Sequence, residues 1–331
     1  MFMFNKITLI YLLAMVLALG ACKNRRNQNE TKSEQVKLAP APAFNADSAY
    51  TYIERQVAFG PRVPNTSAHQ RAGDYLVAKL KEYGWQVTEQ PFTATTYDGK
   101  KLNSRNIIGS FNPQAAKRIL LASHWDSRPN ADEGKGTQNK PVPGANDGAS
   151  GVGVLLELAR TLQQSQNKPS VGVDIIFFDA EDWGNSEKAS DEYGGFLLGS
   201  RYWAANPHKP GYSAYYGILL DMVGAKGATF LKEGTSMQYA PTVVNNVWQV
   251  ASQLGYTQYF VDQLGATLTD DHVPVNTIAK IPMIDIIHLN ASGDRTFFED
   301  WHTIEDDMRN IDRNTLKAVG QTLLQVLYNE E

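Results

Sequence analysis

The sequence predicts an α/β fold, a single domain in which a central mixed, mostly parallel β-sheet is flanked by helices. The clearest indication is residues 173–178, a run rich in β-branched and aromatic side chains that is typical of a strand buried on both faces. Strand-like and helix-like segments alternate along the chain, which favours a parallel sheet covered on both sides. The chain has 331 residues, 42% of them hydrophobic, and can bury a substantial core.

Each element is predicted from its apolar period and its flanking residues. Asn45 and Asp47 are candidate caps for a first helix, and Gly84 ends a second one before an alternating strand begins. The expected helices cover residues 47–59, 66–83, the segment after Gly151 to about 164, 196–205, 241–254 and 314–328. The expected strands cover residues 85–92, 103–110, 118–122, 173–178, 216–220 and 282–287.

The N-terminus combines a charged start with a short apolar run. Lys6 is followed by apolar residues 7–19 and then by Leu19-Gly20-Ala21-Cys22. This run is too short to span a bilayer but suits a secretory signal. The arrangement resembles the lipobox of bacterial lipoproteins, so we expect residues 1–21 to be a signal peptide and Cys22 to be lipidated. An ordinary signal peptide with a chance cysteine is the alternative.

That resemblance implies a membrane-anchored lipoprotein facing the periplasm, in the outer or inner membrane of a Gram-negative bacterium. Residues 22–43 are polar or small and predict a flexible tether, followed by a catalytic domain over residues 44–331. Cys22 is the only cysteine, so the domain has no disulfide and no thiolate metal ligand. Residues 1–37 hold six basic and two acidic residues, which leaves 25 basic against 33 acidic residues, a net charge of −8. Such an acidic domain is a poor candidate for binding nucleic acid.

Polar side chains follow three of the predicted strands where each one ends. These are His124 with Asp126, Glu181 with Asp182, and Asp221, while two loops contribute Asp147 and His302. Ligands of open α/β sheets collect at the carboxyl ends of parallel strands. Carboxylate and imidazole donors without sulfur suit a catalytic zinc. Taken singly, His302 also fits a surface histidine and Asp147 fits a turn.

Five motifs in this order resemble the zinc-dependent aminopeptidases and the glutaminyl cyclases that share their fold. They are His124-Trp125-Asp126-Ser127, Gly144-Ala145-Asn146-Asp147, residues 177–182, residues 220–225 and Trp301-His302-Thr303. The resemblance extends from about Phe59 to the C-terminus. It implies a zinc exopeptidase-like fold, with one zinc ion bound by Asp147, Asp182 and His302. It also implies that Glu181 is the general acid and base, a role that requires a carboxylate within reach of the moving proton.

Three features favour a cyclase over a peptidase. Trp301 directly precedes His302, as in the cyclases, where this indole helps to wall the glutamine pocket. Thr269-Asp270-Asp271-His272 resembles the cyclase loop whose first acid joins the carboxylates matching Glu181 and Asp221 in a hydrogen-bond network. Phe297 or Phe298, with Trp183, is expected to supply the remaining aromatic wall. A core aromatic at Trp301 and a solvated loop at Asp270-Asp271 are the alternatives.

The sequence also departs from the animal cyclases. Asp182 stands where they have Glu, Thr269 replaces a Gln, and their cysteine pair is missing. The expected function is therefore that of a bacterial glutaminyl-peptide cyclotransferase acting on peptides and proteins with an N-terminal glutamine. A zinc aminopeptidase that also recruits His124 and Asp221 to a second zinc is the main alternative, and a non-catalytic binding lipoprotein is another. The sequence does not indicate the oligomeric state.

Overall fold

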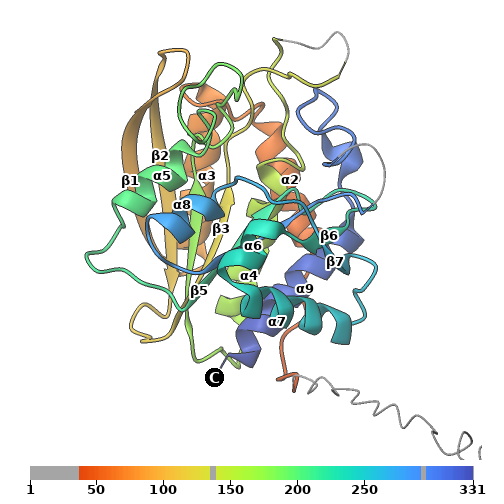
Figure 1. The fold of residues 1–331 in the computed structure, drawn as a ribbon. Coiled ribbons are helices and arrows are strands. Elements are labelled where there is room, and N and C mark those ends of the chain that lie inside the picture. The colour runs from red at the N-terminus through yellow and green to blue at the C-terminus, as the bar shows by residue number, and fades with distance from the viewer. Residues whose placement is uncertain (1–36, 135–138, 292–295, 331) are drawn as a thin grey trace, which may run out of the picture. The chain divides into compact units, whose positions relative to one another are not determined.

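A six-stranded sheet forms the centre of the computed structural model, which describes residues 37–134, 139–291 and 296–330 (Figure 1). Its strand order is β1-β2-β4-β3-β5-β8. Strands β4, β3, β5 and β8 run parallel, whereas β1 and β2 form an antiparallel hairpin beside β4. This arrangement confirms the predicted mixed, mostly parallel sheet. The bounds are β1 Gln86–Thr95, β2 Lys101–Phe111, β3 Arg118–His124, β4 Gly172–Phe178, β5 Tyr216–Asp221 and β8 Met283–Ile287.

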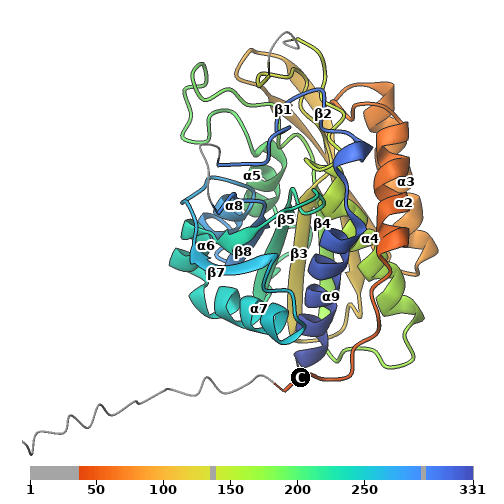
Figure 2. The ribbon, with the colours of Figure 1, turned by 90° about the vertical axis from the view of Figure 1, so that its right-hand side faces the viewer.

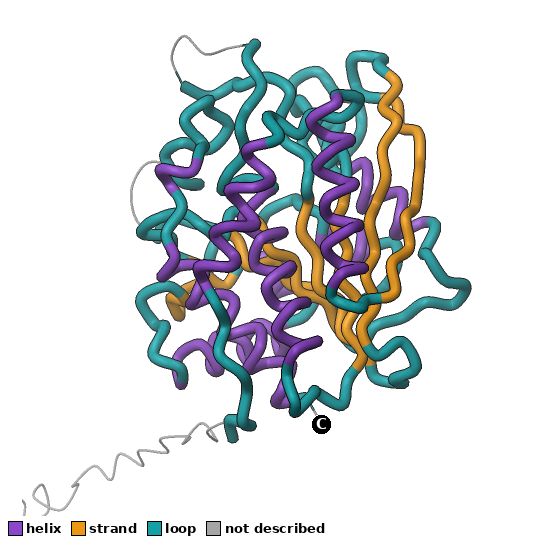
Figure 3. Tube along the Cα trace, turned by 180° about the vertical axis from the view of Figure 1, so that it is seen from behind, coloured by secondary structure: helices purple, strands orange, loops and turns teal. Residues whose placement is uncertain are grey.

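Helices cover both faces of this sheet, which is seen from its edge in Figure 2. Helices α2, α3, α4 and α9 lie on one face, which is turned toward the viewer in Figure 3, and α5 and α8 lie on the other. Helix α7 packs beside α9. The bounds are α2 Ala46–Ala58, α3 Ser67–Glu82, α4 Ala149–Gln164, α5 Leu198–Ala205, α7 Pro241–Gln253, α8 His272–Thr277 and α9 Arg313–Asn329.

Strand β4 is completely buried, as its apolar sequence predicts. Its one charged residue, Asp174, lies inside the sheet and accepts hydrogen bonds from Arg118 Nη2 at 2.7 Å, Ser110 Oγ at 2.5 Å and the Tyr212 hydroxyl at 2.9 Å. These donors compensate the cost of burying a carboxylate. Hydrophobic side chains of the sheet, including Ile176 and Phe178, pack against Trp203 of α5 and Val275 of α8.

The twelve predicted elements are all present, with their ends moved by a few residues, and the structure adds short ones. Strands β6 Phe230–Lys232 and β7 Phe260–Leu264 form a separate two-stranded sheet. Helices α6 Gly234–Tyr239 and α8, and the 3-10 helix η1 Met308–Asn310, are also additional. Each is only three to six residues long, which is too short for a period to be recognised.

The sequence predicts a flexible tether that ends at residue 43. In the structure, residues 37–43 of this segment lie against α9. Gln325 donates to the backbone oxygen of Ala39 at 2.7 Å, and Gln321 donates to that of Pro42 at 3.0 Å. Hydrogen bonds from α9 thus hold this Ala- and Pro-rich segment in place. The predicted signal peptide and Cys22 lie outside the described residues. No helix among the described residues is long and apolar enough to cross a membrane.

Candidate active site

The parallel strands β4, β3 and β5 are neighbours, so their carboxyl ends bring polar residues from distant parts of the sequence together. His124 is the last residue of β3 and lies beside Phe178, the last residue of β4. Glu181 and Asp182 lie in the turn that follows β4, after Asp179 and Ala180, and Asp221 ends β5. The clustering predicted from strand ends is therefore present in the structure.

His124 lies at the centre of this cluster. Its Nε2 is 2.9 Å from Asp147 Oδ1 and 3.2 Å from Asp221 Oδ1. Its Nδ1 is 3.6 Å from Asp126 and 3.9 Å from Glu181. Burial alone would lower the pKa of His124, but contacts with Asp126, Asp147 and Asp221 raise it well above its ordinary value.

The loop that carries Asp147 is fixed by its backbone. Gly148 has φ +92°, and a Cβ there would lie 2.3 Å from the carbonyl oxygen of Asp126, so no other residue fits. Asp306 accepts hydrogen bonds from the N–H groups of Asn146 at 2.8 Å and Asp147 at 3.0 Å. The guanidinium of Arg62, which is fully buried, donates to the carbonyl oxygen of Gly144 at 2.6 Å. These contacts orient Asp147 toward the cluster.

Hydrogen bonds to the backbone also hold the turn that carries Glu181 and Asp182. Asp126 accepts their N–H groups at 3.0 Å and 3.2 Å. Ala180, which precedes them, has φ +55°, a left-handed conformation that is costly for a residue with a Cβ. Because Asp126 holds the turn, the chain reverses sharply and presents both carboxylates to the cavity.

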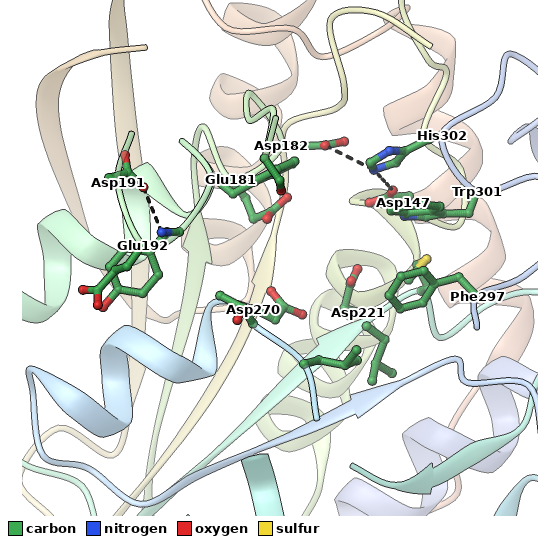
Figure 4. Close-up of a pocket in the computed structure, with 18 residues that line it drawn as sticks. Asp147, Glu181, Asp182, Asp191, Glu192, Asp221, Asp270, Phe297, Trp301 and His302 are labelled. Atoms are coloured by element: carbon green, nitrogen blue, oxygen red, sulfur yellow. Dashed lines mark hydrogen bonds and ion pairs between the residues drawn. The ribbon is translucent and has the colours of Figure 1, made fainter. Parts of the chain in front are cut away.

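Asp147, Asp182 and His302 form a group that could hold a metal ion. His302 Nε2 is 3.5 Å from Asp182 Oδ1 and 3.9 Å from Asp147 Oδ2 (Figure 4). Its other nitrogen, Nδ1, is 2.9 Å from Asp132, and such a carboxylate contact orients metal-binding histidines. Nε2 of His302 is therefore available to bind a metal together with the two carboxylates. Three such ligands suit a zinc ion that keeps one coordination position open for water or substrate. His124, Asp147 and Asp221 form a second possible group that shares Asp147.

The carboxylates around the cavity differ in their surroundings. Burial raises the pKa of Glu181 well above its usual range, and repulsion from Asp182, Asp271 and Asp270 adds to this, although His124 opposes it. Burial also raises the pKa of Asp182, but Arg128, whose Nη1 is 2.7 Å from Oδ1, limits the rise to about 6. Burial raises the pKa of Asp221 to about 7 despite its contact with His124.

A cavity of about 390 Å³ opens onto these residues (Figure 4). Its polar wall contains Asp147, Glu181, Asp182, Asp221, Asp270 and His302, and its apolar wall contains Tyr193, Phe196, Met222, Leu268, Ile287, Phe297 and Trp301. The Trp301 ring is stacked on that of His302, with centroids 3.7 Å apart, and contacts Phe297 at 4.7 Å. Trp301 is thus both a wall of the cavity and a support for His302.

Two of the predicted wall residues lie elsewhere. Trp183 is buried against Val63 and Leu102, with the Lys100 ammonium 4.9 Å from its ring, so it does not line this cavity. Phe298 is buried too, and its ring stacks on His288 with centroids 6.0 Å apart. Adjacent residues of an irregular segment point in different directions, so the sequence does not indicate which phenylalanine faces the cavity. Phe196 and Tyr193 contribute aromatic surface instead.

Residues that no sequence pattern singles out also support the site. Arg62 lies in Gly60-Pro61-Arg62-Val63-Pro64, whose glycine and prolines indicate only the end of a helix, yet its guanidinium holds the Asp147 loop. Arg128 and Asp132 lie in residues 128–146, whose Gly, Pro and Asn content indicates only a loop, and they contact Asp182 and His302 respectively. For Asp306 the sequence carries no signal, because its two partners are about 160 residues away.

Comparisons with known proteins agree with this geometry. The model of peptidase family M28 matches residues 106–327. A glutaminyl-peptide cyclotransferase from Gloydius blomhoffii is 30% identical over 298 residues, which cover 81% of this chain and 77% of that protein.

Solved structures are similar over most of the chain. A glutaminyl cyclase from Bacteroides thetaiotaomicron bound to N-acetylhistamine is 50% identical, with a TM-score of 0.85 over 88% of this chain and 100% of that one. A Zn-dependent exopeptidase from Parabacteroides distasonis is 52% identical, with a TM-score of 0.84 over the same shares.

Proposed function

Because the chain belongs to peptidase family M28 and, within it, to the glutaminyl-peptide cyclotransferases, we propose that it converts N-terminal glutamine of peptides and proteins to pyroglutamate and releases ammonia. The observation that carries this proposal is the position of Glu181. It is a largely buried carboxyl group that lines the same cavity as Asp147, Asp182, His302 and Trp301. Proton transfer next to a metal site requires such a group.

In this proposal Asp147, Asp182 and His302 would hold one zinc ion, and that ion would supply Lewis-acid polarisation of the γ-carboxamide. The substrate's α-amine attacks the carboxamide carbon, the ring C–N bond forms, and the bond to the amide nitrogen breaks. Glu181 takes a proton from the amine and delivers it to the departing nitrogen, so that ammonia leaves. The raised pKa of Glu181 suits a group that must both accept and donate a proton near neutral pH.

The apolar wall has its own part in this reaction. The nucleophile belongs to the substrate, so the enzyme needs no activated water and gains from excluding it. Trp301, Phe297 and Ile287 supply a surface that suits the glutamine methylenes. Asp270 and Asp221 lie on the polar side of the cavity, where they can orient the α-amine and Glu181.

A second candidate is a zinc aminopeptidase, which the group of His124, Asp147 and Asp221 favours. In the cyclase, His124 stays near the metal without binding it. The two functions differ in zinc content and in product. One zinc per purified chain, with pyroglutamyl product and ammonia from a Gln-peptide and little cleavage of Leu- or Ala-amides, is expected. Two zinc ions per chain, with free amino acids released from ordinary peptides, would establish the aminopeptidase instead.

We also propose that the protein acts from a membrane. Cys22 would carry the lipid, and the catalytic domain would face the periplasm, where peptides with N-terminal glutamine are its partners. The short apolar run followed by Leu19-Gly20-Ala21-Cys22 supports this location.

A further inference from the structure

Behind the polar wall of the cavity lies a buried group of titratable residues to which the proposed chemistry gives no role. Asp285 lies in the middle of β8, His272 begins α8, and Glu233 immediately precedes α6. All three are 0% exposed, and Asp270, which is 7% exposed, separates them from the cavity. Buried ionisable groups are costly unless they are paired, so the cluster needs an explanation.

Glu233 and His272 form the rear of the cluster. Glu233 accepts hydrogen bonds from the N–H groups of Thr235 at 2.7 Å, Ser236 at 2.6 Å and Leu268 at 2.8 Å. Burial would raise its pKa, but His272 and Ser236 lower it to about 2, which favours the ionised form of Glu233. His272 Nε2 is 3.3 Å from Glu233 Oε2, which leaves Nδ1 facing Asp285 Oδ2 at 4.0 Å.

Asp285 and Asp270 form the front. Neither carboxyl oxygen of Asp285 has a hydrogen-bond partner among the described residues, and Oδ2 of Asp270 has none either. Atoms of these two groups and of His272 lie within 4.8 Å of one another. Burial and repulsion by Asp270, Asp221 and Glu233 raise the pKa of Asp285 well above its usual range. Two buried carboxyl groups this close cannot both ionise, and one shared proton satisfies both.

We propose that Asp285 is a positioning residue: as a neutral carboxylic acid it donates a hydrogen bond to Asp270 and holds that carboxylate toward Glu181 and Asp221. This inference rests on the proposed cyclase function. A hydrogen bond from Asp285 then orients one side of the Asp270 carboxylate. Asp285 in turn lies next to His272, which is paired with Glu233. The other side of Asp270 faces the cavity, where repulsion between Asp270 and both Glu181 and Asp221 contributes to the raised pKa of each.

A bound cation is the competing explanation of the same unpartnered atoms. Asp270, His272 and Asp285 supply two oxygens and one nitrogen, and Glu233 would orient the imidazole as metal-site carboxylates do. A shared proton satisfies the oxygens without an added species and agrees with the complete burial of Asp285. The two explanations differ in what an asparagine at residue 285 does, because its amide can donate a hydrogen bond but carries no charge for a cation.

The experiment compares Asp285→Asn, Asp285→Leu and the control Asp174→Asn. Asp285→Leu keeps the side-chain size but removes the donor, so kcat for a Gln-peptide should fall roughly 10- to 100-fold, the effect of leaving a buried partner unsatisfied. KM and zinc content should stay near wild type. Asp285→Asn should recover most of the lost kcat. Asp174→Asn alters a buried strand carboxylate outside the cavity and should keep kcat while lowering thermal stability.

A readout that does not depend on activity separates this inference from the proposed function. Infrared difference spectra at neutral pH should show that wild type has a protonated-carboxyl band that both Asp285 variants lose. If wild type lacks pyroglutamate-forming activity but shows this band, the function is wrong and the protonation of Asp285 stands. An unchanged band, equal loss of kcat in Asp285→Asn and Asp285→Leu, or a second metal ion that the Asn variant releases would overturn the inference. If Asp285→Leu does not fold, the infrared spectrum of Asp285→Asn alone tests the inference: loss of the protonated-carboxyl band supports it, and an unchanged band overturns it.

Discussion

Glu181 and Asp182 are neighbours in the sequence, and the groups around them give them different roles. Asp182 is paired with Arg128, whereas Glu181 lies 3.9 Å from the Nδ1 atom of His124. The carboxylate of Asp182 is therefore stabilised as an anion, which suits a metal ligand. Glu181 retains affinity for a proton, which suits an acid and base. Pairs of carboxyl groups whose surroundings push their pKa values apart mark such a division of roles.

The residue-scale prediction concerns Glu181→Gln. The amide keeps the shape of the side chain but cannot carry the proton, so kcat should fall by about 10²–10⁴. Zinc content, measured by metal analysis of the purified variant, should be unchanged because the three proposed ligands remain. His302→Ala is the matched control and should lose the metal. Activity of Glu181→Gln within a few-fold of wild type would show that another group moves the proton.

At the scale of elements, the end of β8 is where the short sheet joins the large one. His288 forms an isolated backbone bridge with Phe230 of β6, and its ring stacks on Phe298. Burial lowers the pKa of His288 to about 4, although a contact with Asn290 opposes this. The imidazole is therefore neutral in the folded protein at neutral pH.

This pKa predicts a loss of stability in acid. Between the unfolded pKa of about 6.5 and the folded pKa of about 4, the unfolded chain binds more protons, so the free energy of unfolding falls as pH falls. From about pH 7 to about pH 5, His288 should account for roughly 2 kcal/mol of that loss. Urea denaturation of wild type and His288→Gln at several pH values measures it. Parallel pH curves for the two proteins would assign the acid sensitivity to other groups.

At the scale of the whole molecule, the proposed location of the enzyme depends on lipid attachment at Cys22. Cys22→Ser removes the only thiol, so lipid attachment cannot occur and the protein should appear in the soluble fraction of the host. Fractionation followed by immunoblotting checks this, with the wild-type protein as the membrane-bound reference. Retention of the Ser variant in the membrane would show that another feature anchors the chain.

The sequence by itself determined the six strands of the large sheet, the six longest helices within the described residues and the clustering of acids and histidines at strand ends. These follow from local patterns: an apolar run over residues 173–178 can be satisfied only by burial on both faces, and parallel neighbours end at the same edge of the sheet. The five motifs then indicated the family. Asp147, Glu181, Asp182, Asp221, Asp270 and His302 all line one cavity.

Only the tertiary structure decided what depends on contacts between distant segments. It assigned Phe297 to the cavity and moved Trp183 and Phe298 out of it, because the orientation of side chains in irregular segments depends on packing from elsewhere. It brought Asp306 under the Asp147 loop across about 160 residues. It also placed Asp285 behind Asp270: the strand pattern predicts where Asp285 lies along β8, and only folding determines which buried group needs its proton.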